Sequence, residues 1–313
     1  MIVMVFNKMG SDFRSWIFAL MLAVLLGGVD NAAGVTEQEA YQAYCEKDYK
    51  KARHLYEELL TLAVPETVAA LKMRLALACY RDQDDVAAFR TYLEALNAVQ
   101  VRQAPTPTAE EQQFLEEGLR IYLDPGGATS REVALILGKK YASIVGEHPE
   151  YFLLNFLVAS AHANLGLFDD FFERFFVSYV HNPQHFLAHK IRGILHVKLF
   201  ERLSDPLERE EQRSLALACL QEAVTVKPND HSLYRMIIAL SRCEDKRSVV
   251  TSSLRKMAAD DIVVPRRDIY FYVQQAVEVG EEEVAKLFLD KAKLWYQYSR
   301  TIDAAEQLLR HHS

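Results

Sequence analysis

Glycine and proline are scarce in this 313-residue sequence, which holds only 12 and 9 of them. Because these residues mark the turns of sheet-rich folds, their scarcity argues against an all-β protein and favours long helices joined by short connections. Half of the residues are hydrophobic and a quarter are charged. The chain therefore has enough apolar material for a buried core and lacks the composition of a disordered protein.

Clustered basic residues are also missing. The net charge is −7, the pI is near 5.8, and no long run of Lys and Arg occurs. A nucleic-acid-binding protein normally carries a basic patch or stripe, so we expect no nucleic-acid partner. The sequence contains no Gly-x-Ser-x-Gly motif, no phosphate loop and no dinucleotide fingerprint. We therefore expect neither enzymatic activity nor a cofactor.

The four cysteines, Cys45, Cys79, Cys219 and Cys243, form no Cys-x-x-Cys pair. An exported protein is permitted a disulfide, and Cys219 and Cys243 would be the pair because they lie on neighbouring predicted helices. The favoured alternative is that all four are small buried hydrophobic side chains.

One uncharged apolar run opens the chain, at residues 16–29, and Lys8 and Arg14 precede it. As a helix this run would span about 21 Å, short of the roughly 30 Å hydrocarbon core of a membrane. A basic start, a short apolar stretch and small residues after it are typical of a secretory signal peptide. We expect removal of residues 1–33 and an exported, periplasmic protein. The alternatives are an inner-membrane anchor, with membrane association through residues 16–29, and a buried helix of a cytosolic protein.

A small or aromatic residue followed four positions later by an aromatic residue or Leu recurs along the chain. The copies are Ala52/Tyr56, Ala88/Tyr92, Phe171/Phe175, Ala216/Leu220, Val250/Leu254 and Ala285/Leu289. Their first positions are about 36, 83, 45, 34 and 35 residues apart, close to the 34-residue helical repeat except at two gaps. The gap of about 83 leaves room for one further helical hairpin, at 109–146.

The segment 151–183 matches the spacing of one repeat, with Ala159 in its first helix, Gly166 at the turn and Pro183 at its end, while Asn155, His162 and Phe171 depart from the residue pattern. This pattern resembles the tetratricopeptide repeat (TPR) family, in which small residues let two helices approach and aromatic residues fill the gap to the next hairpin. The resemblance implies an all-α, right-handed superhelical solenoid of about seven antiparallel helix hairpins. It also implies a scaffold whose concave groove takes an extended or helical peptide.

No single hairpin buries its apolar face alone, so the hairpins are expected to stack. The predicted hairpins are 36–63, 67–99, 109–146, 150–182, 185–227, 231–259 and 267–295, with a closing helix at 297–311. The predicted domains are a signal peptide or anchor at 1–33, TPR-like hairpins at 34–100, a divergent hairpin with its linker at 101–147, and a C-terminal array with the closing helix at 148–313.

A stripe of His185, His189, Arg192 and His196 is the candidate partner-binding site. On a helix these four lie within an arc of about 60°. A different face carries the apolar residues Leu187, Ala188, Ile191, Ile194 and Leu195. Aligning the register of the preceding repeat would instead place three stripe residues in the interior. We favour the solvated face, because burying Arg192 without a partner would cost several kcal/mol.

His185 and His189 also have the i, i+4 spacing of two metal ligands, so a metal-binding protein or an enzyme that uses His185, His189 and His196 is one alternative. The dense aromatic cluster of residues 168–179 is interpreted as core. Together the patterns predict an exported scaffold or adaptor that binds a protein or peptide in a concave helical groove. A cytosolic TPR chaperone of secretion substrates is the remaining alternative.

Overall fold

A computed structural model describes residues 36–102, 106–123, 130–148, 150–242, 247–260, 262–296 and 299–312. Within these ranges the regular elements are α-helices and one short 3-10 helix, and no strand occurs. The predicted all-α class is therefore confirmed for the described residues. None of their helices is both long and apolar enough to cross a membrane. The predicted signal or anchor segment, 1–33, lies outside the described residues, as does its apolar run 16–29.

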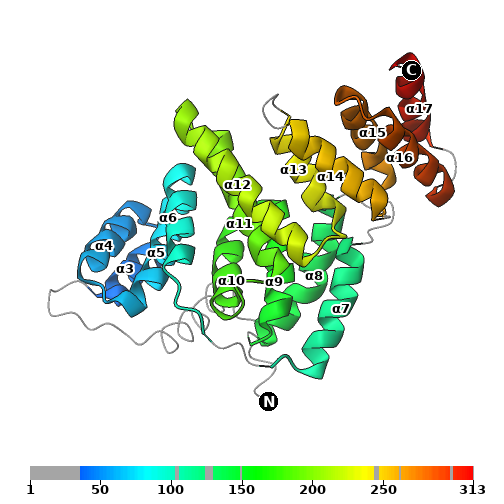
Figure 1. Ribbon diagram of the computed structural model, residues 1–313. Coiled ribbons are helices and arrows are strands. Elements are labelled where there is room, and N and C mark those ends of the chain that lie inside the picture. Colours follow the sequence, from blue (N-terminus) through cyan, green and yellow to red (C-terminus); the bar gives the residue numbers. More distant parts are fainter. Residues whose placement is uncertain are drawn as a thin grey trace. The chain divides into compact units, whose positions relative to one another are not determined.

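Among the described residues, fourteen helices come in seven consecutive pairs, and one further helix follows them (Figure 1). The pairs are α3 (Glu37–Cys45) and α4 (Tyr49–Leu62), α5 (Pro65–Arg81) and α6 (Asp85–Asn97), α7 (Ala109–Leu123) and α8 (Ser130–Glu147), α9 (Phe152–Leu165) and α10 (Phe168–His181), α11 (Phe186–Arg202) and α12 (Pro206–Val226), α13 (His231–Leu240) and α14 (Arg247–Ala259), and α15 (Ile269–Glu278) and α16 (Glu282–Trp295). The closing helix is α17 (Arg300–His312). These pairs match the seven predicted hairpins.

Four of the turns inside the hairpins share one backbone feature. Lys47, Gln83, Gly166 and Gly280 have φ values of 65°, 65°, 75° and 74°, and each lies between the two helices of its pair. A left-handed residue at this place ends the first helix and satisfies its last carbonyls. Gly166 adopts it without steric cost, which confirms the turn predicted there.

All twelve residues of the recurring two-residue pattern are buried, from Ala52 to Leu289. Each pair lies on the second helix of its hairpin. The spacing therefore marks the positions where a second helix meets its neighbours, as the TPR resemblance implies. The aromatic residues of α10 are likewise buried, which confirms their interpretation as core.

The chain divides into two compact units. Unit 1 contains Met1–Pro107 and Gly138–Asn182, and unit 2 contains Thr108–Leu137 and Pro183–Ser313, so the division falls within α8. This grouping differs from the predicted domains, because residues 148–182 belong with the first two hairpins rather than with the C-terminal array.

Unit 1 departs from simple sequential stacking at the fourth pair. Helix α10 packs directly on α5 and α6, so the fourth pair contacts the second. Phe168 and Phe172 make edge contacts with Phe89 at centroid distances of 5.3 and 6.1 Å. Tyr92 lies 4.3 Å from Phe172 by the same measure. The two copies of the repeat pattern that stand about 83 residues apart in sequence are therefore neighbours in space.

Unit 2 stacks its hairpins in chain order, with α12 on α13, α14 on α16, and α17 on α15 and α16. One continuous hydrophobic core runs through these helices, from Leu217 to Ala305. Helices α11 and α12 approach closely at Gly193. A Cβ atom placed on Gly193 would lie 2.9 Å from Cγ of Leu220, so this position requires glycine for the two helices to pack as they do.

Candidate functional site

The predicted histidine stripe lies on α11, and the structure corrects the face assigned to it. His189 and His196 are only 6% and 7% exposed, so the predicted solvated face is wrong for these two residues. His185 and Arg192 are half-buried. The physical reason is that α11 is buried on more than one side. Its polar residues can be buried because they have partners inside unit 2. The register of the preceding repeat, which places His189 and His196 in the interior, is the correct one.

The histidine partners come mainly from the hairpin mate of α11. Nδ1 of His189 lies 2.9 Å from Oε2 of Glu222, and Nδ1 of His196 lies 2.8 Å from Oε1 of Gln212. His185 caps its own helix, because its Nδ1 accepts a hydrogen bond from the backbone N–H of Leu187 at 3.3 Å. The contacts of His189 and His196 join α11 to α12, and that of His185 lies within α11. The partner-binding role predicted for the four residues stays a prediction.

The alternative of a metal site has no support from the geometry. Across the described ranges, no group of three or more His, Cys, Asp or Glu side chains is placed to hold a metal ion. The predicted pairing of Cys219 with Cys243 lies partly outside the described residues, because Cys243 does. Cys79 and Cys219 are buried and Cys45 is exposed. The interpretation as buried hydrophobes is therefore confirmed for two of the four.

Unit 1 contains an open groove of about 480 Å³ that sequence reasoning did not find. We call it the tyrosine–acid groove. The first helices of the first two pairs, α3 and α5, supply part of its lining, and the N-terminal half of α10 supplies its acidic residues. Its lining residues are Tyr41, Tyr44, Cys45, Lys47, Tyr49, Leu77, Arg81, Asp169, Asp170 and Glu173. The volume falls in the range of ligand-binding clefts.

Three tyrosine rings form one wall of the groove. The rings of Tyr41 and Tyr44 are stacked at a centroid distance of 6.5 Å, and Tyr49 meets Tyr44 edge-on at 5.5 Å. The spacing of Tyr41 and Tyr44 places both on one face of α3, because residues three apart are neighbours on a helix. All three rings are half-buried, so part of each remains accessible to a ligand.

Arg81 links the tyrosine wall to the acidic wall. Its Nε lies 2.7 Å from Oδ1 of Asp169, and both Arg81 and Tyr44 line the groove. Burial raises the pKa of Asp169, and Arg81 opposes that rise. Burial also raises the pKa of Tyr44, so its hydroxyl keeps its proton. The groove thus presents the neutral phenol of Tyr44 beside the ion pair of Arg81 and Asp169.

Glu173 lies one helical turn beyond Asp169 and Asp170. Burial and the neighbouring charge of Asp170 raise its pKa to about 7, although Arg74 and Arg174 oppose the shift. Arg74 is paired with Glu37 on α3, and Arg174 donates to Oδ1 of Asn155. The negative charge of Glu173 is therefore poorly compensated inside the groove.

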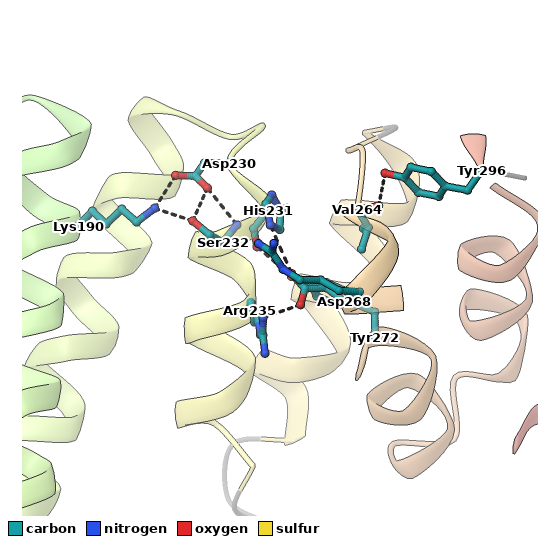
Figure 2. A network of polar contacts seen from close by, with 10 residues as sticks. Lys190, Asp230, His231, Ser232, Arg235, Val264, Asp268, Tyr272 and Tyr296 are labelled. Atoms are coloured by element: carbon teal, nitrogen blue, oxygen red, sulfur yellow. Dashed lines mark hydrogen bonds and ion pairs between the residues drawn. The ribbon is translucent and has the colours of Figure 1, made fainter. Parts of the chain in front are cut away.

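Unit 2 carries a second polar feature, a ladder of ion pairs along its first helices (Figure 2). Lys190 of α11 and Asp230 at the start of α13 are 5% and 2% exposed, and Nζ of Lys190 lies 2.9 Å from Oδ2 of Asp230. Lys190 also donates to Ser232 and to the hydroxyl of Tyr122 on α7. Burial opposes the charged form of Lys190, but Asp230 and Tyr122 hold its pKa above the usual value.

The next rung repeats this arrangement one hairpin later. Asp268, just before α15, accepts from Nη1 of Arg235 on α13 at 2.5 Å, and Nε2 of His231 lies 3.6 Å from its other oxygen (Figure 2). Burial alone would raise the pKa of Asp268, but His231 and Arg235 bring it below the usual value. The hydroxyl of Tyr272 donates to the carbonyl oxygen of His231 at 2.9 Å. Each acid thus starts a first helix and pairs with a cation of the preceding first helix, which fixes the register of stacking.

Sequence reasoning missed both the ladder and the groove. Asp230 stands directly before the apolar pattern of α13 and caps that helix, which is an N-cap signal that the sequence carries, whereas Asp268 makes no capping hydrogen bond. The groove had no comparable signal, since it depends on α10 reaching the second pair.

Comparisons with known proteins add little beyond this geometry. No protein-family model matches the chain, and no curated protein matches it. Solved structures similar to it include a thermophilic TPR protein from Thermus thermophilus, at 16% identity over 64% of this chain and 98% of that one, with a TM-score of 0.44. Another is a tetratricopeptide repeat protein from Parabacteroides merdae, at 15% identity over 88% of this chain and 96% of that one, with a TM-score of 0.23. The description of the chain as an all-α array of TPR-like hairpins rests on its own helices and their buried repeat positions.

Proposed function

We propose that this chain is an exported scaffold that holds another protein, and that the tyrosine–acid groove binds a peptide segment of that partner. The observation that carries the proposal is the groove itself, which is open, about 480 Å³ in volume, and lined by aromatic and charged side chains. Tyrosine is suited to such a surface because it offers a large rigid contact area together with a polar hydroxyl.

Photo-cross-linking from the groove tests the binding site. A photoreactive phenylalanine analogue replaces Tyr41 in the full chain, and a matched variant carries it at His54, whose side chain is 70% exposed on α4 and does not line the groove. We expect a protein adduct from position 41 in the native cells and none from position 54. Equal adducts at both positions, or none at position 41, would contradict the proposal.

Export is supported by the apolar run 16–29 with its basic start, which is typical of a signal peptide. Mass spectrometry of the native protein is expected to show the loss of about 33 residues. Recovery of the intact chain from the soluble cytosol would instead favour the cytosolic chaperone.

A further inference from the structure

The three arginines around the acidic wall of the groove are already engaged. Arg81 is paired with Asp169, Arg74 with Glu37, and Arg174 with Asn155. In the part of the chain that the structure describes, no hydrogen bond or ion pair joins the side chain of Asp170 or of Glu173. Two carboxyl groups of the groove are therefore open to a ligand.

The position of Glu173 makes a positive ligand favourable. The charged and titratable groups near the two carboxyl groups are Arg74 and Arg81 on α5, Tyr41 and Tyr44 on α3, Lys47 in the following turn, Asp169 and Arg174 on α10, and His162 on α9, which interacts with Asp170. Burial and Asp170 outweigh the two nearest arginines and raise the pKa of Glu173 to about 7. The ionised form of such a carboxyl group is stabilised when a cation binds beside it.

The opposite wall is suited to the same ligand. A side-chain cation within about 6 Å of a tyrosine ring is attracted to the face of that ring, by about 0.5–2 kcal/mol. Half-buried rings of Tyr41, Tyr44 and Tyr49 and the carboxyl groups of Asp170 and Glu173 line the same groove.

We infer that the groove takes a lysine or arginine side chain of the partner's peptide, seated between the tyrosine rings and the carboxyl groups of Asp170 and Glu173. This inference rests on the proposed function, because it names the chemistry that the groove recognises. A peptide rich in Asp or Glu would instead face Asp170 and Glu173 as like charges.

A pH dependence follows from the raised pKa of Glu173. A bound cation lowers the pKa of Glu173, so binding releases a proton when this group is protonated in the free protein. Affinity is then low below pH 7 and rises as pH rises through about 7. With complete coupling the gain between pH 6 and pH 8 is about tenfold.

A random peptide library panned against the full chain tests the inference. We expect the recovered peptides to share a Lys or Arg, and one of them, synthesised with a fluorescent label, to bind about tenfold more weakly to Glu173→Gln at pH 8. Asp170→Asn, at an exposed position, is expected to weaken binding as well. Asp290→Asn, an exposed charge removal in unit 2, is the matched control and is expected to leave the affinity unchanged. The pH dependence should vanish in Glu173→Gln.

The outcomes separate the inference from the proposed function. Peptides that lack Lys and Arg but lose binding in a Tyr41→Ala variant would overturn the inference and leave the groove as a peptide site. Peptides that bind wild type, Glu173→Gln and Asp170→Asn equally would also overturn it. A lack of any binding that depends on Tyr41, together with no cross-link from position 41, would overturn the proposed function too.

Discussion

The hydroxyl group of Tyr92 donates a hydrogen bond to the backbone carbonyl oxygen of Phe172, 2.6 Å away and 80 residues later in the chain. Tyr92 and Phe172 are both fully buried, and their rings are 4.3 Å apart. This pair holds α10 on the second hairpin, and α10 in turn supplies the acidic wall of the groove.

Removal of the Tyr92 hydroxyl tests this link. Tyr92→Phe is expected to lower the free energy of unfolding of unit 1 by about 1 kcal/mol, because one buried hydrogen bond is lost. Tyr92→Ala is expected to cost about 3–5 kcal/mol, because it also leaves a cavity in the aromatic cluster. Denaturation followed by circular dichroism measures both. Tyr270→Phe, at a 37% exposed ring in unit 2, is the control and should change stability by less than about 0.5 kcal/mol.

The buried rung of Lys190 and Asp230 predicts strong coupling. Asp230→Ala is expected to cost about 3–5 kcal/mol, because it leaves the ammonium of Lys190 buried without its counter-charge and removes the cap of α13. The double variant Lys190→Met/Asp230→Ala should be less destabilised than the sum of the two single variants, which a double-mutant cycle measures.

An exposed ion pair provides the comparison for this cycle. Nζ of Lys72 lies 2.6 Å from Glu94, but the Glu94 side chain is 51% exposed. Lys72→Met is therefore expected to cost less than about 1 kcal/mol. Equal losses in Lys72→Met and Asp230→Ala would show that burial of the rung contributes nothing.

His185 predicts a loss of stability in mild acid. Burial, His189 and Lys227 lower its pKa to about 4, whereas an unfolded histidine titrates near 6.5. Below pH 6.5 the unfolded chain binds the proton first, so stability is complete above pH 6.5 and falls as pH drops toward 4. Between pH 7.5 and pH 5 the loss from this residue is up to about 2 kcal/mol.

The variant His185→Asn isolates this effect, since Asn also caps a helix but does not titrate. We expect it to flatten the dependence of the unfolding free energy on pH between 7.5 and 5. His196, whose pKa is also lowered by burial, accounts for part of the remaining slope. An unchanged slope in His185→Asn would contradict the assignment.

Two helical glycines predict opposite responses to alanine. Gly193→Ala is expected to lower stability by about 1–3 kcal/mol, because the new methyl group would meet Leu220 at 2.9 Å and force α11 and α12 apart. Gly146→Ala, with no atom within 4 Å of the new methyl group, should raise stability by about 0.5 kcal/mol through helix propensity. Thermal unfolding compares the two, and a stabilised Gly193→Ala would disprove the close packing.

The hairpins were predictable from the sequence because their information is local. Asp48, Asp84 and Asp205 cap the second helices of their pairs, and Gly166 and Gly280 mark turns with positive φ. Repeat spacing then places the small and aromatic residues on the buried face. These signals act over four to about 35 residues, which a single sequence displays directly.

The site was not predictable because it depends on which helices meet. α11 carries apolar side chains such as Leu187 and Leu195 on one face and buries His189 and Lys190 elsewhere, so amphipathicity alone could not assign its exposed side. In the same way, Tyr44 and Glu173 belong to one groove only because α10 contacts α5. The sequence does not show that the fourth hairpin contacts the second, because the third lies between them in the chain.

The contact between α10 and the second hairpin also sets an order of events during synthesis. α6 ends at Asn97 and α10 begins at Phe168, so about 70 residues must be made before α10 exists. At roughly 5–20 residues per second this takes between about 4 and 14 seconds. In a regular repeat array each new hairpin is covered by the next one. Here Phe89 and Tyr92 stay uncovered until α10 has been synthesised. During that interval the nascent chain exposes an aromatic surface, and this is the period in which a ribosome-associated chaperone would protect it from aggregation.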